Sequence, residues 1–436
     1  MSNPGQSGLV RAIGRWSLAA LIVNSIIGSG IFGLPSVIAG LVGTASTWAV
    51  LLAGAAIGVI MACYAELASQ FQEAGGPYLY ARTAFGRLAG IETGWMLWLS
   101  QLAAPAANAN LFIIYLGEFW PAANAPLPRF LILTLLIGIL TFINYRGVRA
   151  GTEVSNVFTV AKLLPLAIVI VGGTAYFLST RAGTTVSTTS VNAHDWPKAI
   201  LLLLFAYGGF ETALTPMSEA KDPRRDTVFG LFAALITCTL VYTLIQWVVV
   251  GVLPDPAHSE RPLADVVRLF LGEKGAALIA IGALVSVYGY LSAKILAVPR
   301  ITYALAERSD LPPLFAAVHP RFRTPYFSIL IFAVAAWALA WFGSFAWNVT
   351  LSALARLFYY GIGCAALPVL RKKQPGAALF RLPGGPVFAF AGVAICLALV
   401  TQVDLSGSII LLATVLAALL NWVWVRNREA GETSVR

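Results

Sequence analysis

Runs of apolar residues repeat along almost the whole chain, and short polar connections separate them. Many runs hold about 20 residues, and an α-helix of that length crosses a hydrocarbon layer of about 30 Å. Segments 130–143 and 409–424 are apolar on every face, whereas the strands of a membrane β-barrel alternate apolar and polar residues. The pattern therefore predicts an all-α membrane protein. The twelve predicted spans are 17–39, 44–69, 88–116, 128–145, 155–178, 197–218, 227–252, 274–300, 326–343, 349–369, 386–402 and 408–425.

The composition supports a membrane protein and excludes an ordinary soluble domain. Of the 436 residues, 58% are hydrophobic and only 11% are charged, whereas soluble domains hold about 25% charged residues. We expect one membrane domain with short tails at 1–16 and 426–436. The four cysteines lie inside predicted spans and form no CxxC pair, which favours buried thiols over a disulfide or metal framework. Neither a metal nor a cofactor is expected.

The distribution of positive charge indicates the orientation of the chain. The formal net charge is +10, but the basic residues lie in short connections, so they do not indicate nucleic-acid binding. With the N-terminus in the cytoplasm, 20 of the 29 lysines and arginines fall on the cytoplasmic side, six on the opposite side and three inside spans. This bias predicts a multi-pass protein of the cytoplasmic (inner) membrane with both termini in the cytoplasm.

Two predicted spans contain glycine clusters near their middles. The first span holds GSGIFGLP at 28–35, and the sixth holds FAYGGFET at 205–212. Glycine costs about 1 kcal/mol relative to alanine inside a helix, and proline costs more. One such cluster is explained by close helix packing. Two clusters, with Gly28 and Gly208 lying 180 residues and five spans apart, are typical of transporters built from two inverted repeats with discontinuous first helices.

The predicted repeats cover 17–178 and 197–369, and 386–425 adds two further helices. Because each repeat holds five spans, the two repeats have opposite topology. At each break, free N–H groups and a positive helix end favour an anion, whereas free carbonyls and a negative helix end favour a cation. A ligand with both a carboxylate and an ammonium group satisfies both kinds of group near the bilayer centre. The sequence therefore predicts an α-amino acid as the substrate.

At these residues the chain resembles the amino acid–polyamine–organocation (APC) superfamily, over nearly its whole length. The most specific elements are GSGIF at 28–32 and FAYGGFE at 205–211. Supporting segments follow in the same order, namely AGGPY at 74–78, NYRGV at 144–148 and EAKDPRR at 219–225. The resemblance implies an alternating-access carrier with ten core helices and two more.

The resemblance also implies a substrate site at the two breaks. In the superfamily the substrate carboxylate meets backbone amides of the first break, here 29–31. The amino group meets carbonyls of the second break, here Phe205, Ala206 and Gly208, and Phe205 matches an aromatic residue that closes over the substrate. The candidate substrate-binding residues are Gly28, Ser29, Gly30, Ile31, Phe205, Ala206, Tyr207, Gly208, Gly209 and Glu211.

Charged residues inside the predicted spans are candidates for coupling. Lys162 matches a lysine that replaces a sodium ion in some branches of the superfamily, and it either stabilises the first break permanently or exchanges a proton during transport. Glu211 either accepts a proton or a substrate amine, or binds an N–H group freed by the break. Lys294 is expected to extend toward the cytoplasmic interface.

Three further residues are candidates for a gate or for specificity. Arg356 departs from the superfamily pattern, and it either pairs with Glu211, contacts a substrate side chain or forms a gate. Asn108 and Ser286 are polar enough to line a pocket, although hydrogen bonds between helices explain them equally well.

These features predict a secondary active transporter of amino acids that works as a proton symporter or an exchanger, without sodium. A mostly apolar pocket favours a neutral amino acid, whereas Glu211 also suits a cationic amino acid or a polyamine, and Arg356 suits an acidic one. A transport-dead amino acid sensor is a further alternative. No catalytic cluster or nucleotide-binding motif is apparent, so an enzyme is not expected. The expected partners are the substrate, protons or a counter-substrate, and the lipid bilayer.

Overall fold

The chain folds into helices joined by short connections. The computed structural model describes residues 14–71, 75–146, 152–180, 192–214 and 222–434, and contains no β-strand within these ranges. The α-helices are α1 (Arg15–Ile26), α2 (Gly30–Val42), α3 (Ser46–Gln70), α4 (Gly76–Phe85), α5 (Arg87–Leu116), α6 (Pro126–Tyr145), α7 (Thr152–Thr180), α8 (Asp195–Tyr207), α9 (Phe210–Ala213), α10 (Pro223–Val252), α11 (Pro262–Glu307), α12 (Tyr326–Phe342), α13 (Phe345–Lys373), α14 (Gly385–Val400) and α15 (Leu405–Ser434). The short 3₁₀ helices are η1 (Gly43–Ala45), η2 (Pro121–Asn124), η4 (Pro256–His258) and η5 (Pro313–Ala316).

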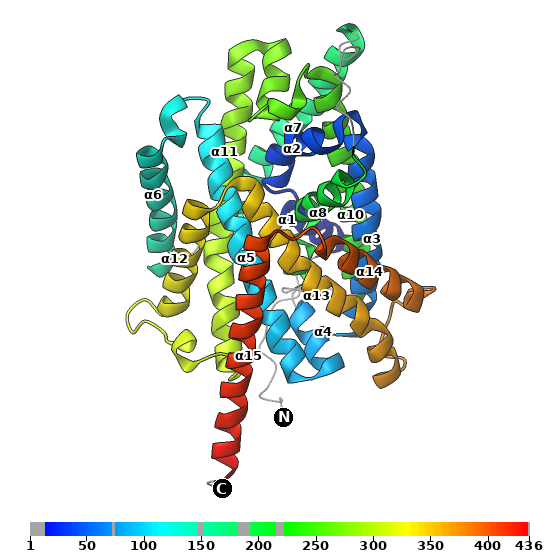
Figure 1. Cartoon of the computed structure of the whole chain (residues 1–436), viewed down its shortest axis with the longest axis vertical. Helices are drawn as coiled ribbons and strands as arrows, with labels where there is room; N and C mark the ends of the chain where they lie inside the picture. Colours follow the sequence, from blue (N-terminus) through cyan, green and yellow to red (C-terminus); the bar gives the residue numbers. More distant parts are fainter. Residues whose placement is uncertain (1–13, 72–74, 147–151, 181–191, 215–221, 435–436) are drawn as a thin grey trace.

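The long helices have the length and composition of membrane spans. Within the described residues, eight segments are long and apolar enough to cross a membrane, and the shorter apolar helices α12 and α14 accompany them. One of the eight segments, 30–70, joins α2 and α3 across η1. Figure 1 shows many of the long helices running along the vertical axis, with α15 projecting beyond the others at the lower end. The protein is therefore a multi-pass helical membrane protein.

Helix α5 lies at the centre of the bundle. In its most apolar window 83% of the residues are buried, compared with 28% for α6 and 22% for α7 and for α15. It packs against α4, α11, α12, α13 and α15. The exposed faces of the outer helices carry large apolar side chains such as Leu135, Val171 and Leu412, as expected where a helix faces lipid. Polar side chains of α5 therefore point into the interior of the protein.

Several helix boundaries differ from the predicted ones. The connection expected from 254 to 272 is helical from Pro262, and Gly272, with a φ of 66°, interrupts α11. Helix α4 was not predicted, because it is short and begins at a Gly-Gly-Pro sequence typical of a turn. Helix α15 continues through most of the predicted C-terminal tail. Residues 1–13 of the N-terminal tail and 215–218 of the sixth predicted span lie outside the described residues.

Asp310, which follows α11, joins α4, α5 and α15. Its carboxylate, in a residue only 2% exposed, forms ion pairs with Arg82 and Arg87, each at 2.7 Å. Tyr78 donates its hydroxyl to the same carboxylate, and Asn421 of α15 donates to the Asp310 carbonyl at 2.7 Å. Burial and the hydrogen bond to Asp310 raise the pKa of Tyr78 to about 12. The phenol therefore remains a donor at neutral pH.

Glu66 and Arg371 form a second ion pair, between α3 and α13. The guanidinium donates to both carboxylate oxygens, at 2.7 Å from Nε and 2.6 Å from Nη2, and the Leu382 N–H donates at 2.7 Å. The Glu66 side chain is fully buried, whereas 17% of the Arg371 side chain is exposed. Such two-pronged pairing is stronger than a single hydrogen bond and fixes the relative orientation of both groups.

Replacing Arg371 by leucine is expected to lower the thermal unfolding midpoint of the detergent-solubilised protein. The change leaves a buried carboxylate without its partner, which typically costs about 3–5 kcal/mol. Replacing the neighbouring, exposed Lys372 by leucine is the control and should have little effect. A double variant that also carries Glu66→Gln should recover part of the loss, because the uncompensated charge is removed. An Arg371→Leu midpoint equal to that of the control would contradict this role.

Candidate functional site

The first predicted span is interrupted where the glycine cluster lies. Helix α1 ends at Ile26 and α2 begins at Gly30. The N–H groups of Phe32 and Gly33 both donate to the Ser29 carbonyl at 3.1 Å. Because the first N–H groups of a helix have no intrahelical acceptor, those of residues 29–31 remain available to a ligand. These are the groups that the resemblance implies for a substrate carboxylate, at the positive end of α2.

Lys162 of α7 binds the end of α1. Its Nζ atom donates to the carbonyls of Asn24 at 2.9 Å and Ile27 at 3.0 Å, and the residue is only 6% exposed. The ammonium group therefore satisfies carbonyls at the negative end of α1, where a cation is favoured. These contacts fit the interpretation of Lys162 as a group that stabilises the break.

The second break follows α8, which ends at Tyr207. Gly209 has a φ of 117°, and a Cβ atom there would lie 2.4 Å from the Ser25 carbonyl oxygen of α1. The Ser25 hydroxyl donates to the Gly209 carbonyl at 3.1 Å. On the other side of the break, a Cβ at Gly30 would lie 2.9 Å from the Ala206 Cα. The two breaks are therefore in direct contact, and glycine permits that contact at both places.

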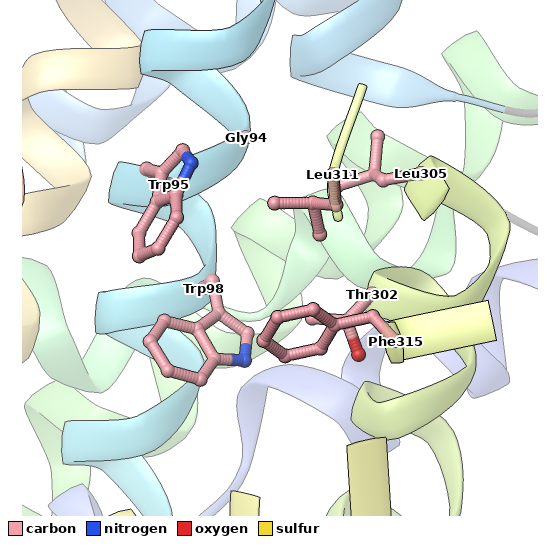
Figure 2. Close-up of a pocket in the computed structure, with 7 residues that line it drawn as sticks. All are labelled: Gly94, Trp95, Trp98, Thr302, Leu305, Leu311 and Phe315. Atoms are coloured by element: carbon pink, nitrogen blue, oxygen red, sulfur yellow. The ribbon is translucent and has the colours of Figure 1, made fainter. Parts of the chain in front are cut away.

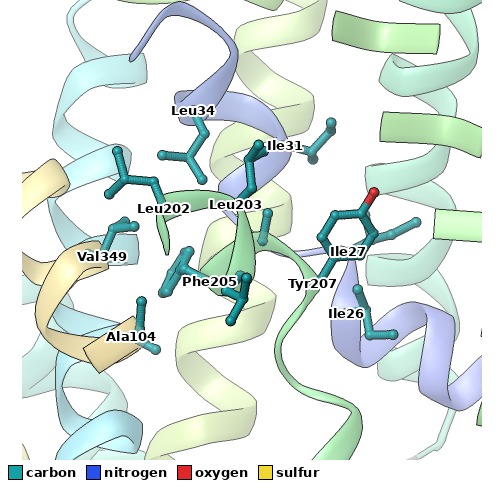
Figure 3. Packing of buried hydrophobic residues seen from close by; sticks show 14 of the residues in the cluster. Ile26, Ile27, Ile31, Leu34, Ala104, Leu202, Leu203, Phe205, Tyr207 and Val349 are labelled. Atoms are coloured by element: carbon teal, nitrogen blue, oxygen red, sulfur yellow. The ribbon is translucent and has the colours of Figure 1, made fainter. Parts of the chain in front are cut away.

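Buried apolar side chains surround the two breaks. Figure 3 shows Ile31 and Leu34 of α2 above Leu202, Leu203 and Phe205 of α8. Ala104 of α5 and Val349 of α13 lie on the neighbouring helices in the same view. Tyr207 is also buried, and its hydroxyl donates to the Val50 carbonyl of α3 at 3.1 Å.

Glu211 is fully buried and is bound by protein donors. Oε2 accepts the Gly209 N–H at 2.9 Å and the Tyr360 hydroxyl at 3.0 Å, and Oε1 accepts the Tyr359 hydroxyl at 2.9 Å. Its side chain is 0% exposed. The bond to Gly209 is the local bonding to a freed N–H group that the sequence left open. The two tyrosines tie the carboxylate to α13.

Arg356 of α13 lies beside Glu211. Its Nε atom is 3.8 Å from Glu211 Oε1 and donates to Ser100 Oγ at 3.2 Å. Nη1 donates to the Phe205 carbonyl at 3.4 Å, and the guanidinium lies over the Phe205 ring at 5.4 Å from its centroid. A Cβ at Gly208 would lie 1.0 Å from Nη1. Of the alternatives that the sequence left open, pairing with Glu211 is the one present in this structure.

Two carbonyls of the second break, those of Phe205 and Ala206, already have donors. Phe205 accepts the Gly208 N–H at 3.1 Å in addition to Arg356, and Ala206 accepts the Tyr242 hydroxyl at 3.0 Å. The resemblance implies that these carbonyls bind a substrate amino group. Sequence analysis did not single out Tyr242 of α10, since a tyrosine within an apolar run gives no signal of its partner. A bound ammonium group would share these acceptors with the protein.

Lys294 of α11 points into the protein instead of toward an interface. Its Nζ atom donates to Gln101 Oε1 of α5 at 2.8 Å and lies 5.4 Å from the centroid of the Tyr290 ring. The expected extension to the interface is wrong, because α11 continues well beyond residue 300 and Lys294 lies far from its end. The residue is half-buried, so it is less enclosed than Arg356.

Asn108 and Ser286 are buried, and within the described residues neither forms a hydrogen bond with the residues of the breaks. The Asn108 side-chain amide donates to the Ala104 carbonyl within α5 at 2.8 Å. Ser286 is buried in α11. A gate or specificity role for either residue stays a prediction.

Two cavities lie between the helices, one of them reaching the start of α2. One, with a volume of about 450 Å³, extends from Gly33 and Phe345 to the η4 region at Arg261. Figure 2 shows the other, between Trp95 and Trp98 of α5 and Leu305 of α11. No charged side chain lines this second cavity. This second cavity therefore offers no charged partner to an amino acid zwitterion.

Comparison with known proteins identifies the family. A family model described as amino acid permease matches residues 13–425. The chain belongs to the amino acid permease family. Among curated relatives of this permease, the methylthioribose transporter of Bacillus subtilis is 28% identical over 89% of this chain and 87% of its own length. The branched-chain amino acid permease BcaP of the same organism is 26% identical over 92% and 89%.

A third relative is the serine/threonine exchanger SteT of Bacillus subtilis, which is 28% identical over 88% of this permease and 90% of its own length. These relatives are transporters, permeases or exchangers, so this chain is a transporter and not an enzyme. The family also confirms the resemblance to the APC superfamily.

Proposed function

We propose that this permease is a secondary carrier that moves amino acids across the cytoplasmic membrane by alternating access. The observation that carries the proposal is the contact between the two helix breaks. At this contact the N–H groups at the start of α2 lie against the carbonyl end of α8. An amino acid presents a carboxylate to the first set and an ammonium group to the second.

The helix order supports a twelve-span arrangement. In this arrangement α1 with α2, and α8 with α9, are the broken first spans of two repeats. The other spans of the first repeat are α3, α5, α6 and α7, and those of the second are α10, α11, α12 and α13. Helices α14 and α15 then follow the two repeats. Both termini lie in the cytoplasm in this arrangement, as the positive-inside bias indicates.

Coupling to protons or to a counter-substrate fits the position of Lys162 better than coupling to sodium. The ammonium group binds the Asn24 and Ile27 carbonyls, which are the oxygen ligands that a sodium ion at this break would need. A second cation at the same carbonyls would be repelled at close range.

Uptake by the purified permease in liposomes tests the proposal. Labelled amino acids should accumulate when an inward proton gradient or an internal counter-substrate is supplied, and replacing sodium by choline should change the rate less than twofold. Uptake that disappears in choline would contradict the assignment of Lys162. Specific binding of an amino acid without any uptake or exchange would instead indicate a sensor, and uptake of arginine or putrescine alone would indicate a carrier of cationic substrates.

A further inference from the structure

The four ionisable side chains around the two breaks are not balanced in charge. Lys162, Lys294 and Arg356 are basic, and Glu211 is the acidic member among the described residues. Lys162 is compensated by carbonyls at the end of α1, and Arg356 is paired with Glu211. Lys294 has no carboxylate partner in the described part of the chain, and its hydrogen bond goes to the neutral Gln101. Lys294 is therefore the basic side chain of this group that has neither a carboxylate nor backbone carbonyls as partners among the described residues.

Gln101 adds a second donor beside that charge. Its Oε1 atom accepts from Lys294, so its Nε2 amide group points elsewhere. Gln101 is 1% exposed, and Nε2 has no hydrogen-bond partner. A buried amide donor without a partner costs free energy comparable to a lost hydrogen bond. Lys294 and Gln101 together thus present an ammonium group and an unsatisfied N–H donor, which is a set that a carboxylate satisfies.

Close neighbours of Lys294 and Gln101 on α11 and α5 contact the two breaks. Tyr290, one helical turn before Lys294, contacts the first break, because a Cβ at Gly28 would lie 3.8 Å from its ring. Gln101 directly follows Ser100, which binds Arg356 at the second break. Gly28 and Lys294 are both half-buried, whereas Arg356 is enclosed with 3% of its side chain exposed. Lys294 is therefore the more exposed of these two cations, and it lies one helical turn from a residue that contacts the first break.

We propose that Lys294 and Gln101 bind the side-chain carboxylate of an acidic amino acid, so that this permease selects aspartate or glutamate over their amides. This inference rests on the amino acid carrier proposed above and replaces the neutral substrate that the sequence alone favoured. The substrate α-carboxylate meets the start of α2, and its second carboxylate offsets the charge of Lys294. An amide side chain can accept hydrogen bonds from both groups but leaves the charge of Lys294 unbalanced, and an apolar side chain also leaves the Gln101 amide unsatisfied.

Binding of four ligands to the purified full-length permease tests the inference. We expect L-aspartate and L-glutamate to bind at least tenfold more tightly than L-asparagine and L-glutamine, measured by calorimetry and by thermal shift. Lys294→Met should reduce this preference to less than twofold while changing the affinity for the amides little. Lys274→Met is the matched control, because this exposed lysine lies on the same helix, and it should retain the full preference.

A second variant tests the same pair in case Lys294→Met does not fold. Gln101→Glu keeps the shape of the side chain and supplies Lys294 with an internal carboxylate. It should therefore abolish the preference for acids and spare the binding of amides. A preference for acids that persists in both variants would overturn the role of the pair.

The outcome also separates this inference from the proposed function. If the wild type transports neutral amino acids and excludes the acids, the inference of an acidic substrate is wrong, whereas the proposed function as an amino acid carrier is supported. If no amino acid binds or moves, the proposed function fails as well.

Discussion

Replacing Lys162 by alanine is expected to abolish the accumulation of substrate in liposomes. The change removes two charge-assisted hydrogen bonds to the Asn24 and Ile27 carbonyls, each worth about 1.5–3 kcal/mol. It also leaves carbonyl groups at the end of α1 without a donor inside the protein. Because α1 and α2 must be held at a fixed break to bind substrate, we expect at least a hundredfold loss of proton-driven uptake.

The same variant separates the two roles that the sequence left open for Lys162. If the lysine only stabilises the break, binding, exchange and accumulation should fall together. If it carries the coupled proton, exchange of labelled for unlabelled substrate should persist while accumulation is lost. Lys198→Ala is the control, because this exposed lysine begins α8 away from the break. Normal accumulation by Lys162→Ala would refute both roles.

Replacing Arg356 by leucine is expected to have the largest effect on stability among the site residues. Glu211 is 0% exposed and Arg356 only 3%, so the change leaves an uncompensated buried charge that typically costs about 3–5 kcal/mol. The Phe205 carbonyl loses a donor at the same time. We expect a thermal midpoint lower by several degrees and uptake reduced to background.

A double-mutant cycle with Glu211→Gln tests whether the two charges act as a pair. The double variant should be more stable than Arg356→Leu alone, because neither charge then remains unpaired. Its transport should stay low, because Arg356 also positions Phe205 and the end of α8. If the loss of stability in the double variant equals the sum of the losses in the two single variants, the two charges are not coupled.

The glycine clusters made the helix breaks predictable from the sequence. Glycine and proline disfavour a continuous helix in hydrocarbon, and both interruptions lie within the predicted clusters 28–35 and 205–212. The apolar runs predicted most helices for the same reason, since span length follows from bilayer thickness. Boundaries beyond the apolar core, as in α11 and α15, were missed because polar residues continue those helices.

The partners of the buried polar groups were not predictable. Arg356 and Glu211 are separated by many residues and lie on different helices, so their pairing depends on how α9 and α13 pack. The direction of Lys294 depends on the rotation of α11 about its own axis, which a nearly all-apolar helix does not reveal. The hydrogen bonds of Tyr242 were not predicted, because the sequence does not distinguish a buried tyrosine whose hydroxyl binds a carbonyl from one that only packs its ring.

The hydroxyl of Tyr242 lies 3.1 Å from the Ile26 carbonyl of α1 and 3.0 Å from the Ala206 carbonyl of α8. A phenol has a single hydrogen, so it can donate fully to only one of these two oxygens at a time. If α1 and α8 separate in the proposed transport cycle, the hydrogen can stay with either carbonyl, and the other carbonyl becomes free to bind water or substrate. Such a separation would break one full hydrogen bond at this point and not two.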